Sequence, residues 1–182
     1  MSITFTRIDP VGVDREPLIS FMTRNEFPFH VWSHPTREIV ETAISGGAYR
    51  DDDNDSYWID HSEHGRIGFF RFEDLSEDTP LFDFRLDAPF RRRALGPEVL
   101  RAATQHVFTT MPTVNRFEGQ TREDNVAMRK TFLRCGWVKE AHYRESWPNE
   151  EGTLLASIAY AILRRDWETG ETTHLIWDDL SV

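Results

Sequence analysis

The chain has 182 residues, a formal net charge of -10, 39% hydrophobic residues and a single cysteine, Cys135. This size suits one folded domain, the negative charge argues against general nucleic-acid binding, and one cysteine excludes a disulfide framework or a cysteine-based zinc site. The longest apolar run, around 154–163, is too short to cross a bilayer, and the first residues lack a signal-peptide pattern. We therefore expect a cytoplasmic protein with neither membrane nor nucleic-acid partners.

The first half of the chain predicts strands and short helices in alternation. An alternating run at 3–8 indicates a first strand, and two helices follow, one after Asp14 and one ending at Gly46-Gly47. The loop between these helices, 26–35, is rich in aromatic residues and contains two histidines. Three strands are then expected, at 56–61, 67–72 and 81–86, with a turn at 63–65 between the first two.

The second half predicts helices alternating with strands, followed by a closing hairpin. The expected elements are a helix from Gly96 to about Thr110, a strand at 117–121, a helix capped by Asp124-Asn125, and strands at 138–147 and 153–164. This order predicts an α+β domain whose mixed, mostly antiparallel sheet is flanked by helices. We place the domain at 1–167 and expect the tail, 168–182, to dock on it or on a partner subunit, which allows for a homodimer.

The loop between the strand at 81–86 and the helix beginning at Gly96 contains three consecutive arginines, Arg91, Arg92 and Arg93. Unpaired N–H groups and the positive end of the helix dipole make such a turn an anion site. Arginine adds charge and forked donors that suit phosphate. The sequence therefore predicts that this loop holds a diphosphate.

Two motifs, one helix and one strand apart, resemble the GNAT superfamily of acyl-CoA-dependent N-acetyltransferases. Arg91-Arg92-Arg93-Ala94-Leu95-Gly96 is similar to the motif Arg/Gln-x-x-Gly-x-Gly/Ala, and residues 125–137, Asn-Val-Ala-x-Arg-x-x-Phe-x-x-Cys-Gly-Trp, are similar to the second motif. The resemblance covers roughly 3–167 and is closest to the RimJ/RimL-like branch, which acetylates ribosomal-protein N-termini. That branch also contains enzymes that act on unrelated amines.

The resemblance implies acetyl-CoA as the acyl donor and assigns roles residue by residue. The pyrophosphate would lie on the backbone of Arg91, Arg92, Arg93, Ala94, Leu95 and Gly96. The pantetheine would run beside Phe84, Arg85 and Leu86 and contact Asn125, with Phe132 beside the thioester. A backbone N–H near Phe84 or Arg85 would stabilise the oxyanion, and the aromatic loop would form the acceptor wall through Phe29, His30 and Trp32.

Two departures from the family pattern affect the predicted phosphate loop. Ala94 stands where the family has its first motif glycine, which is tolerable only if its φ angle is negative. Pro97 removes an N–H group that many members direct at phosphate.

Both standard catalytic positions of the family lack a titratable group in this chain. The family's tyrosine acid is Phe132 here and its glutamate base is Gln120. Positioning and an oxyanion hole can suffice, or another residue can act as base: Glu118 first, because it shares a strand face with Gln120, then Asp83, Tyr143 or His30. If Glu118 is the base, Glu118→Gln lowers turnover and shifts its pH profile.

We expect an N-acetyltransferase that passes the acetyl group directly to a primary amine, either a peptide N-terminus or a small molecule. One alternative is a module that senses acyl-CoA without turnover, and another is a scaffold that self-associates through Leu175–Trp177. No metal is expected, because His30 and His34 lie in a loop bounded by prolines rather than on a helix.

Overall fold

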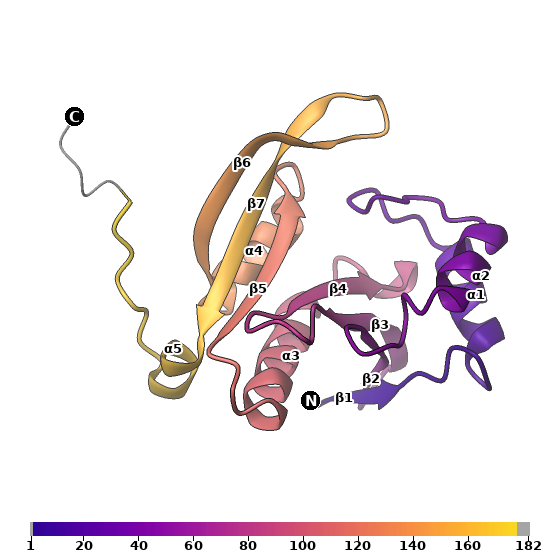
Figure 1. Ribbon diagram of the computed structural model, residues 1–182, viewed down its shortest axis with the longest axis horizontal. Helices are drawn as coiled ribbons and strands as arrows, with labels where there is room; N and C mark the ends of the chain where they lie inside the picture. Colours follow the sequence, from indigo (N-terminus) through magenta and orange to yellow (C-terminus); the bar gives the residue numbers. More distant parts are fainter. Residues whose placement is uncertain (1, 178–182) are drawn as a thin grey trace.

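A computed structural model describes residues 2–177 and contains two antiparallel sheets. The first sheet has the strand order β1 (Ile3–Arg7), β2 (Asp55–His61), β3 (Gly65–Glu73) and β4 (Leu81–Leu86). The second has the order β5 (Arg116–Arg122), β7 (Leu154–Leu163) and β6 (Val138–Pro148). The helices are α1 (Arg15–Arg24), α2 (Arg37–Ser45), α3 (Gly96–Thr110), α4 (Val126–Arg134), α5 (Arg164–Thr169) and the short 3-10 helix η1 (Ala88–Phe90), arranged as in Figure 1.

The predicted α+β class and the predicted order of strands and helices are confirmed, with η1 and α5 as additions. Hydrogen bonding divides the strands into two sheets, however, instead of one continuous sheet. Alternation along β3 explains how helices cover both faces of the first sheet. Phe70 and Phe72 pack in one core with the inner face of α3, while Phe69 packs in a second core with α1 and α2.

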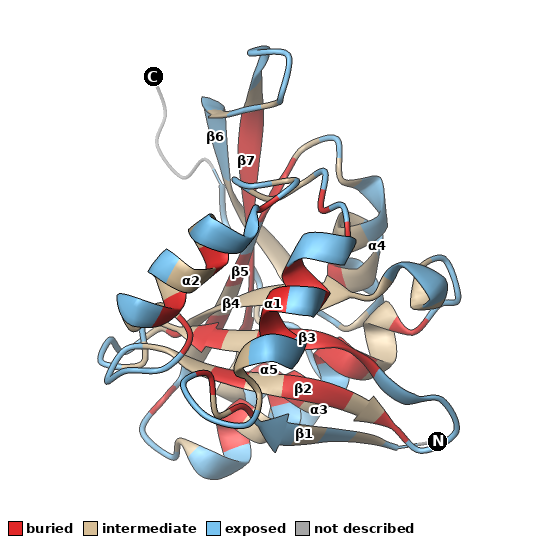
Figure 2. Ribbon diagram, turned by 90° about the vertical axis from the view of Figure 1, so that its right-hand side faces the viewer, coloured by how far each residue is buried: buried red, intermediate tan, exposed pale blue. Residues whose placement is uncertain are grey.

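The second sheet has a buried central strand and an exposed outer one. Figure 2 shows β7 buried along most of its length and β6 largely exposed. Helix α4 packs beside this sheet: Phe132 is fully buried and stacks on Tyr160, with ring centroids 4.6 Å apart. Gly136 adopts φ +78° just after α4, which lets the buried Trp137 pack back on Phe132.

The two sheets separate where β4 and β5 meet, as Figure 1 shows. Among the described residues, one backbone hydrogen bond joins them, from the Glu118 N–H to the Pro80 carbonyl, at 3.1 Å. On its other side β4 pairs with β3, and the Asp87 N–H donates to the Ile67 carbonyl at 2.9 Å. Because bonded pairs alternate along antiparallel strands, the backbone N–H of Phe84 points away from β3, toward the gap beside β5.

The arginine loop contains two residues in the left-handed region, which corrects the expectation for Ala94. Arg92 and Ala94 both have φ near +60°, whereas the sequence analysis required a negative φ at Ala94. The following Leu95 is right-handed, with φ -73° and ψ -22°. This alternation directs successive N–H groups toward the same side, so the backbone keeps the shape that glycine would give and Ala94 bears the strain.

The C-terminal tail is partly described. Trp167 of α5 packs against Phe108, with ring centroids 5.5 Å apart, whereas Leu175, Ile176 and Trp177 are exposed. The predicted docking of the tail on a partner subunit stays a prediction, and its residues 178–182 lie outside the described residues.

The left-handed Ala94 gives a first test. Ala94→Gly removes the clash between Cβ and the carbonyl oxygen, so we expect the free energy of unfolding to rise by about 1 kcal/mol. Ala102→Gly, in the middle of α3, is the matched control and lowers it by about 1 kcal/mol, the usual helix cost. Urea denaturation measures both values. A loss of stability in both variants would contradict the strained loop.

Candidate active site

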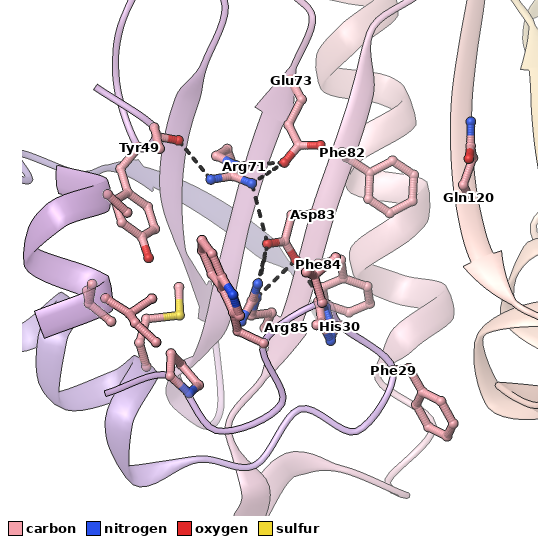
Figure 3. A pocket seen from close by; sticks show the side chains of 18 of the residues that line it. Phe29, His30, Tyr49, Arg71, Glu73, Phe82, Asp83, Phe84, Arg85 and Gln120 are labelled. Atoms are coloured by element: carbon pink, nitrogen blue, oxygen red, sulfur yellow. Dashed lines mark hydrogen bonds and ion pairs between the residues drawn. The ribbon is translucent and has the colours of Figure 1, made fainter. Parts of the chain in front are cut away.

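A cavity of about 730 Å³ lies between the loop joining α1 to α2, helix α2, strand β4 and the end of β5. This volume is in the range of small-molecule sites. The predicted acceptor residues Phe29, His30 and Trp32 all line it, as do Phe84 and Arg85 of β4 and Asn125 at the start of α4. Gln120 faces the cavity from β5, across from β4, as Figure 3 shows.

The cavity floor contains a compact charge cluster around Asp83, shown in Figure 3. Arg85 donates to the Asp83 carboxylate from Nε and Nη2, the latter at 2.8 Å, and Arg71 lies 3.7 Å away. Burial by itself raises the pKa of the Asp83 carboxyl, but Arg85, His30 and Arg71 together lower that pKa well below its ordinary value. Asp83 is therefore a fixed anion that organises its neighbours, and its carboxylate is too weakly basic to remove a proton from an ammonium.

His30 pairs with the same carboxylate. Its Nε2 lies 3.1 Å from Asp83 Oδ1, which favours the tautomer that carries the proton on Nε2. The other ring nitrogen, Nδ1, is buried and has no hydrogen-bond partner among the described residues. An amine in the cavity has no direct path to Nδ1 in this conformation, so His30 serves as a wall of the cavity.

The arginine loop lies at the end of β4, outside this cavity, and divides its charges between two tasks. Arg91 donates from Nε to the Leu86 carbonyl at 2.9 Å and from Nη2 to Asn25 Oδ1 at 3.3 Å, so it holds the loop in place. Burial lowers the pKa of the Arg91 guanidinium. Arg92 and Arg93 are exposed and available to an anion.

The start of α3 suits a diphosphate. No side chain caps the helix at Leu95, so its first N–H groups are available to an anion together with the backbone of Ala94 and Leu95. Gly96 allows α3 to approach α4, because a Cβ there would lie 3.1 Å from Thr131 Oγ1. The loop thus offers backbone N–H groups and two exposed arginines to a diphosphate.

Two residues of the second motif, Asn125 and Phe132, also stabilise the fold. Asn125 caps α4 by accepting a hydrogen bond from the Met128 N–H and donates to Thr121 Oγ1. Asn125 also lines the cavity. Phe132, in contrast, is fully buried in the core and does not line the cavity. A thioester in the cavity would therefore not touch Phe132 in this structure.

Two of the catalytic candidates lie away from the cavity. Glu118 shares a face with Gln120, as predicted, and accepts a hydrogen bond from Gln120 Nε2 at 3.0 Å. Its carboxylate is ion-paired with Arg116 at 2.6 Å and does not line the cavity. Tyr143 is 49% exposed on β6, also outside the cavity, whose β6 contribution comes from Trp147. Of the proposed catalytic residues, Asp83 and His30 line the cavity.

Two residues of this region were missed by the sequence analysis. Arg71 is part of the cluster, and the signal was present: it is a single charge within the apolar strand run Phe69-Phe70-Arg71-Phe72. Buried Asn25 accepts hydrogen bonds from the Ala88 N–H and from Arg91, thereby joining the end of α1 to the arginine loop. Nothing in the local sequence marks Asn25 for this role.

Two further features bear on the site and its surroundings. Within residues 2–177, no group of three or more His, Cys, Asp or Glu side chains is placed to hold a metal ion. No helix in that same part of the chain is long and apolar enough to cross a membrane.

Comparison with known proteins identifies the family. Residues 4–138 match the family described as acetyltransferase (GNAT) domain, whereas no curated protein matches the chain. A spermidine N-acetyltransferase from Vibrio cholerae, solved with CoA and spermine, is similar in fold with a TM-score of 0.76 and 13% identity, covering 92% of this chain and 98% of that one. RimL, a ribosomal L7/L12 alpha-N-protein acetyltransferase solved with coenzyme A, has a TM-score of 0.71 and 16% identity, covering 90% and 94%. The chain belongs to the GNAT acetyltransferase domain family, and it is therefore an acetyl-CoA-dependent acetyltransferase.

Proposed function

We propose that the chain transfers the acetyl group of acetyl-CoA to a primary amine by direct attack. The observation that supports this most is the cavity beside β4, into which the acceptor loop brings Phe29, His30 and Trp32. Phe84 lines the same cavity, and its N–H is directed to the gap between the sheets. An amine in the cavity and a thioester in the gap would thus meet at one backbone donor.

In this proposal the donor and the acceptor approach from different sides. The diphosphate binds the backbone of Ala94, Leu95 and Gly96 with help from Arg92 and Arg93. The pantetheine continues along Phe84, Arg85 and Leu86, past Asn125. The oxyanion accepts a hydrogen bond from the Phe84 N–H, which is preorganised because the strand itself holds it. The structural neighbours acetylate spermidine and a ribosomal-protein N-terminus, which fits a primary amine as acceptor here.

In this proposal the rate acceleration comes from holding the amine and the thioester in contact. Holding two reactants in contact can lower the barrier by about 7–11 kcal/mol. An ammonium must first lose a proton to the solvent, and an apolar cavity favours this loss because burial disfavours the charged form. The neutral nitrogen attacks the thioester carbon, the C–N bond forms, and the C–S bond breaks with its electron pair on sulfur. The second amine proton then passes to the thiolate, giving the amide and free CoA.

Gln120 and Phe132 replace the titratable residues of the family pattern, so turnover is tested directly against the alternative of acyl-CoA sensing without transfer. The release of free CoA in the presence of a panel of amines separates the two. Thiol release above the hydrolysis rate supports acetyl transfer. Tight acetyl-CoA binding with no release for any amine supports sensing.

Charge removal at the arginine loop tests the donor site. We expect Arg92→Ala and Arg93→Ala each to weaken acetyl-CoA binding by about tenfold, because each removes a charge-assisted contact to phosphate. The loss should shrink at high salt. Calorimetry measures the affinity, and Arg144→Ala, an exposed arginine on β6, serves as the matched control. Equal affinities for all these variants would place the diphosphate elsewhere.

The pH dependence tests the absence of an enzymic base. We expect kcat/KM to rise about tenfold per pH unit until the acceptor's own pKa is reached, because only the neutral amine reacts. With an acceptor of lower pKa, the pH at which kcat/KM levels off should fall by the difference between the two acceptors' pKa values. Glu118→Gln should leave the profile unchanged, contrary to the sequence-based expectation, since its carboxylate is paired with Arg116 outside the cavity. A shift in that variant would restore Glu118 as the base.

A further inference from the structure

The acceptor cavity has a largely apolar lining, and two of its large apolar residues, Trp32 and Val31, are exposed. Trp32 is 54% exposed and the neighbouring Val31 is 81% exposed, although both line the cavity. Phe29 and Trp147 add two aromatic rings, and Ile39 of α2 adds an aliphatic side chain. Exposed apolar groups gathered around a hollow mark a binding site for an apolar ligand.

The charged groups of the cavity are largely neutralised by one another. Its carboxylates are Glu38, Glu73 and Asp83. Asp83 is paired with Arg85 at 2.8 Å, and Glu73 accepts from Arg71 Nε at 2.8 Å. Glu38, at the start of α2, has no ion-pair partner among the described residues. With two arginines and three carboxylates, the cavity has room for one additional positive charge.

We propose that the acceptor is a monoamine attached to an aromatic or similarly bulky apolar body, and that Trp32 and Phe29 select it. This inference rests on the proposed function and specifies its substrate class. A polyamine has several ammonium groups, and each needs a carboxylate or water when it is buried. The cavity offers one free carboxylate and many apolar surfaces, so an apolar body gains more from it than a chain of charges does.

The apolar body also fits the chemistry. An aromatic group that fills the cavity expels water from around the nitrogen, and the neutral, reactive form of the amine is favoured where water is excluded. Binding of the apolar group thus selects the substrate and at the same time favours the neutral, reactive amine. The same chemistry can be presented by a free arylalkylamine or by a peptide whose first residue is phenylalanine, and the two sources are separate arms of the test.

The test compares kcat/KM for phenylethylamine, a phenylalanyl peptide amide, propylamine and spermidine in the full chain with acetyl-CoA. We expect at least one of the two aromatic amines to exceed both propylamine and spermidine by about tenfold or more, in line with the burial of an aromatic ring. Whichever aromatic arm is faster identifies the source. Preference for spermidine over both aromatic amines would overturn the inference.

Matched variants connect the preference to the cavity. Trp32→Ala should lower kcat/KM for the preferred aromatic amine by about tenfold and leave propylamine within about twofold. Trp177→Ala removes a tryptophan that is 59% exposed and outside the cavity, so it should change neither. A large loss with spermidine in Glu38→Gln, together with none in Trp32→Ala, would indicate a polyamine site instead.

A binding measurement keeps failure of the substrate class distinct from failure of the function. Calorimetry with the protein–CoA complex reports aromatic-amine binding without any turnover. Binding that is lost in Trp32→Ala, with no thiol release, would uphold the apolar acceptor class and overturn acetyl transfer. Thiol release without aromatic preference would do the reverse. Melting temperatures of the variants show that each is folded, which is expected because Trp32 lies on an exposed loop.

Discussion

The site depends on one constraint, the failure of β4 and β5 to pair along their length. A single backbone hydrogen bond, from Glu118 to Pro80, joins these strands among the described residues. Backbone polar groups that leave a sheet need other partners: the Leu86 carbonyl takes a hydrogen bond from Arg91, and the Phe84 N–H faces the gap. An uninterrupted sheet would satisfy the backbone of β4 and leave neither a space for a ligand nor a donor for an oxyanion.

Electrostatics and burial act at separate places around this gap. Exposed charge is concentrated at Arg92 and Arg93, beside a helix start that lacks a side-chain cap. In the cavity, by contrast, Arg85, Arg71 and His30 surround Asp83 and neutralise its charge. The basic end therefore suits a highly charged donor, and the neutralised end suits a ligand of low charge. The formal charge of -10 for the whole chain predicts neither property.

Most of the helices and strands can be predicted from the hydrophobic periodicity and from the capping and turn residues, because both act on neighbouring residues in the chain. Strand β4 and helix α3 have the predicted limits, and Asn125 caps the start of α4 as expected. The site is less predictable. Alternation places Glu118 and Gln120 on one face but does not say that Arg116 occupies the Glu118 carboxylate. The φ of Ala94 is set by the fold around it, and two of the three partners of Asp83, His30 and Arg71, come from other elements of the chain.

Asn25 gives the molecule a property that concerns its engineering. Its side chain joins the end of α1, where the acceptor loop begins, to Ala88 and Arg91 at the approach to the phosphate loop. The segments proposed to bind the two substrates are thus joined by a buried amide, together with the Arg24–Asp87 ion pair at 2.6 Å and Arg91 over the Phe27 ring, although 66 residues of sequence separate Asn25 from Arg91. A graft that exchanges the acceptor loop with a relative's has to begin after Phe27 or replace Arg91 as well. Only the part of the loop beyond Phe27 can be exchanged without altering these contacts to the arginine loop.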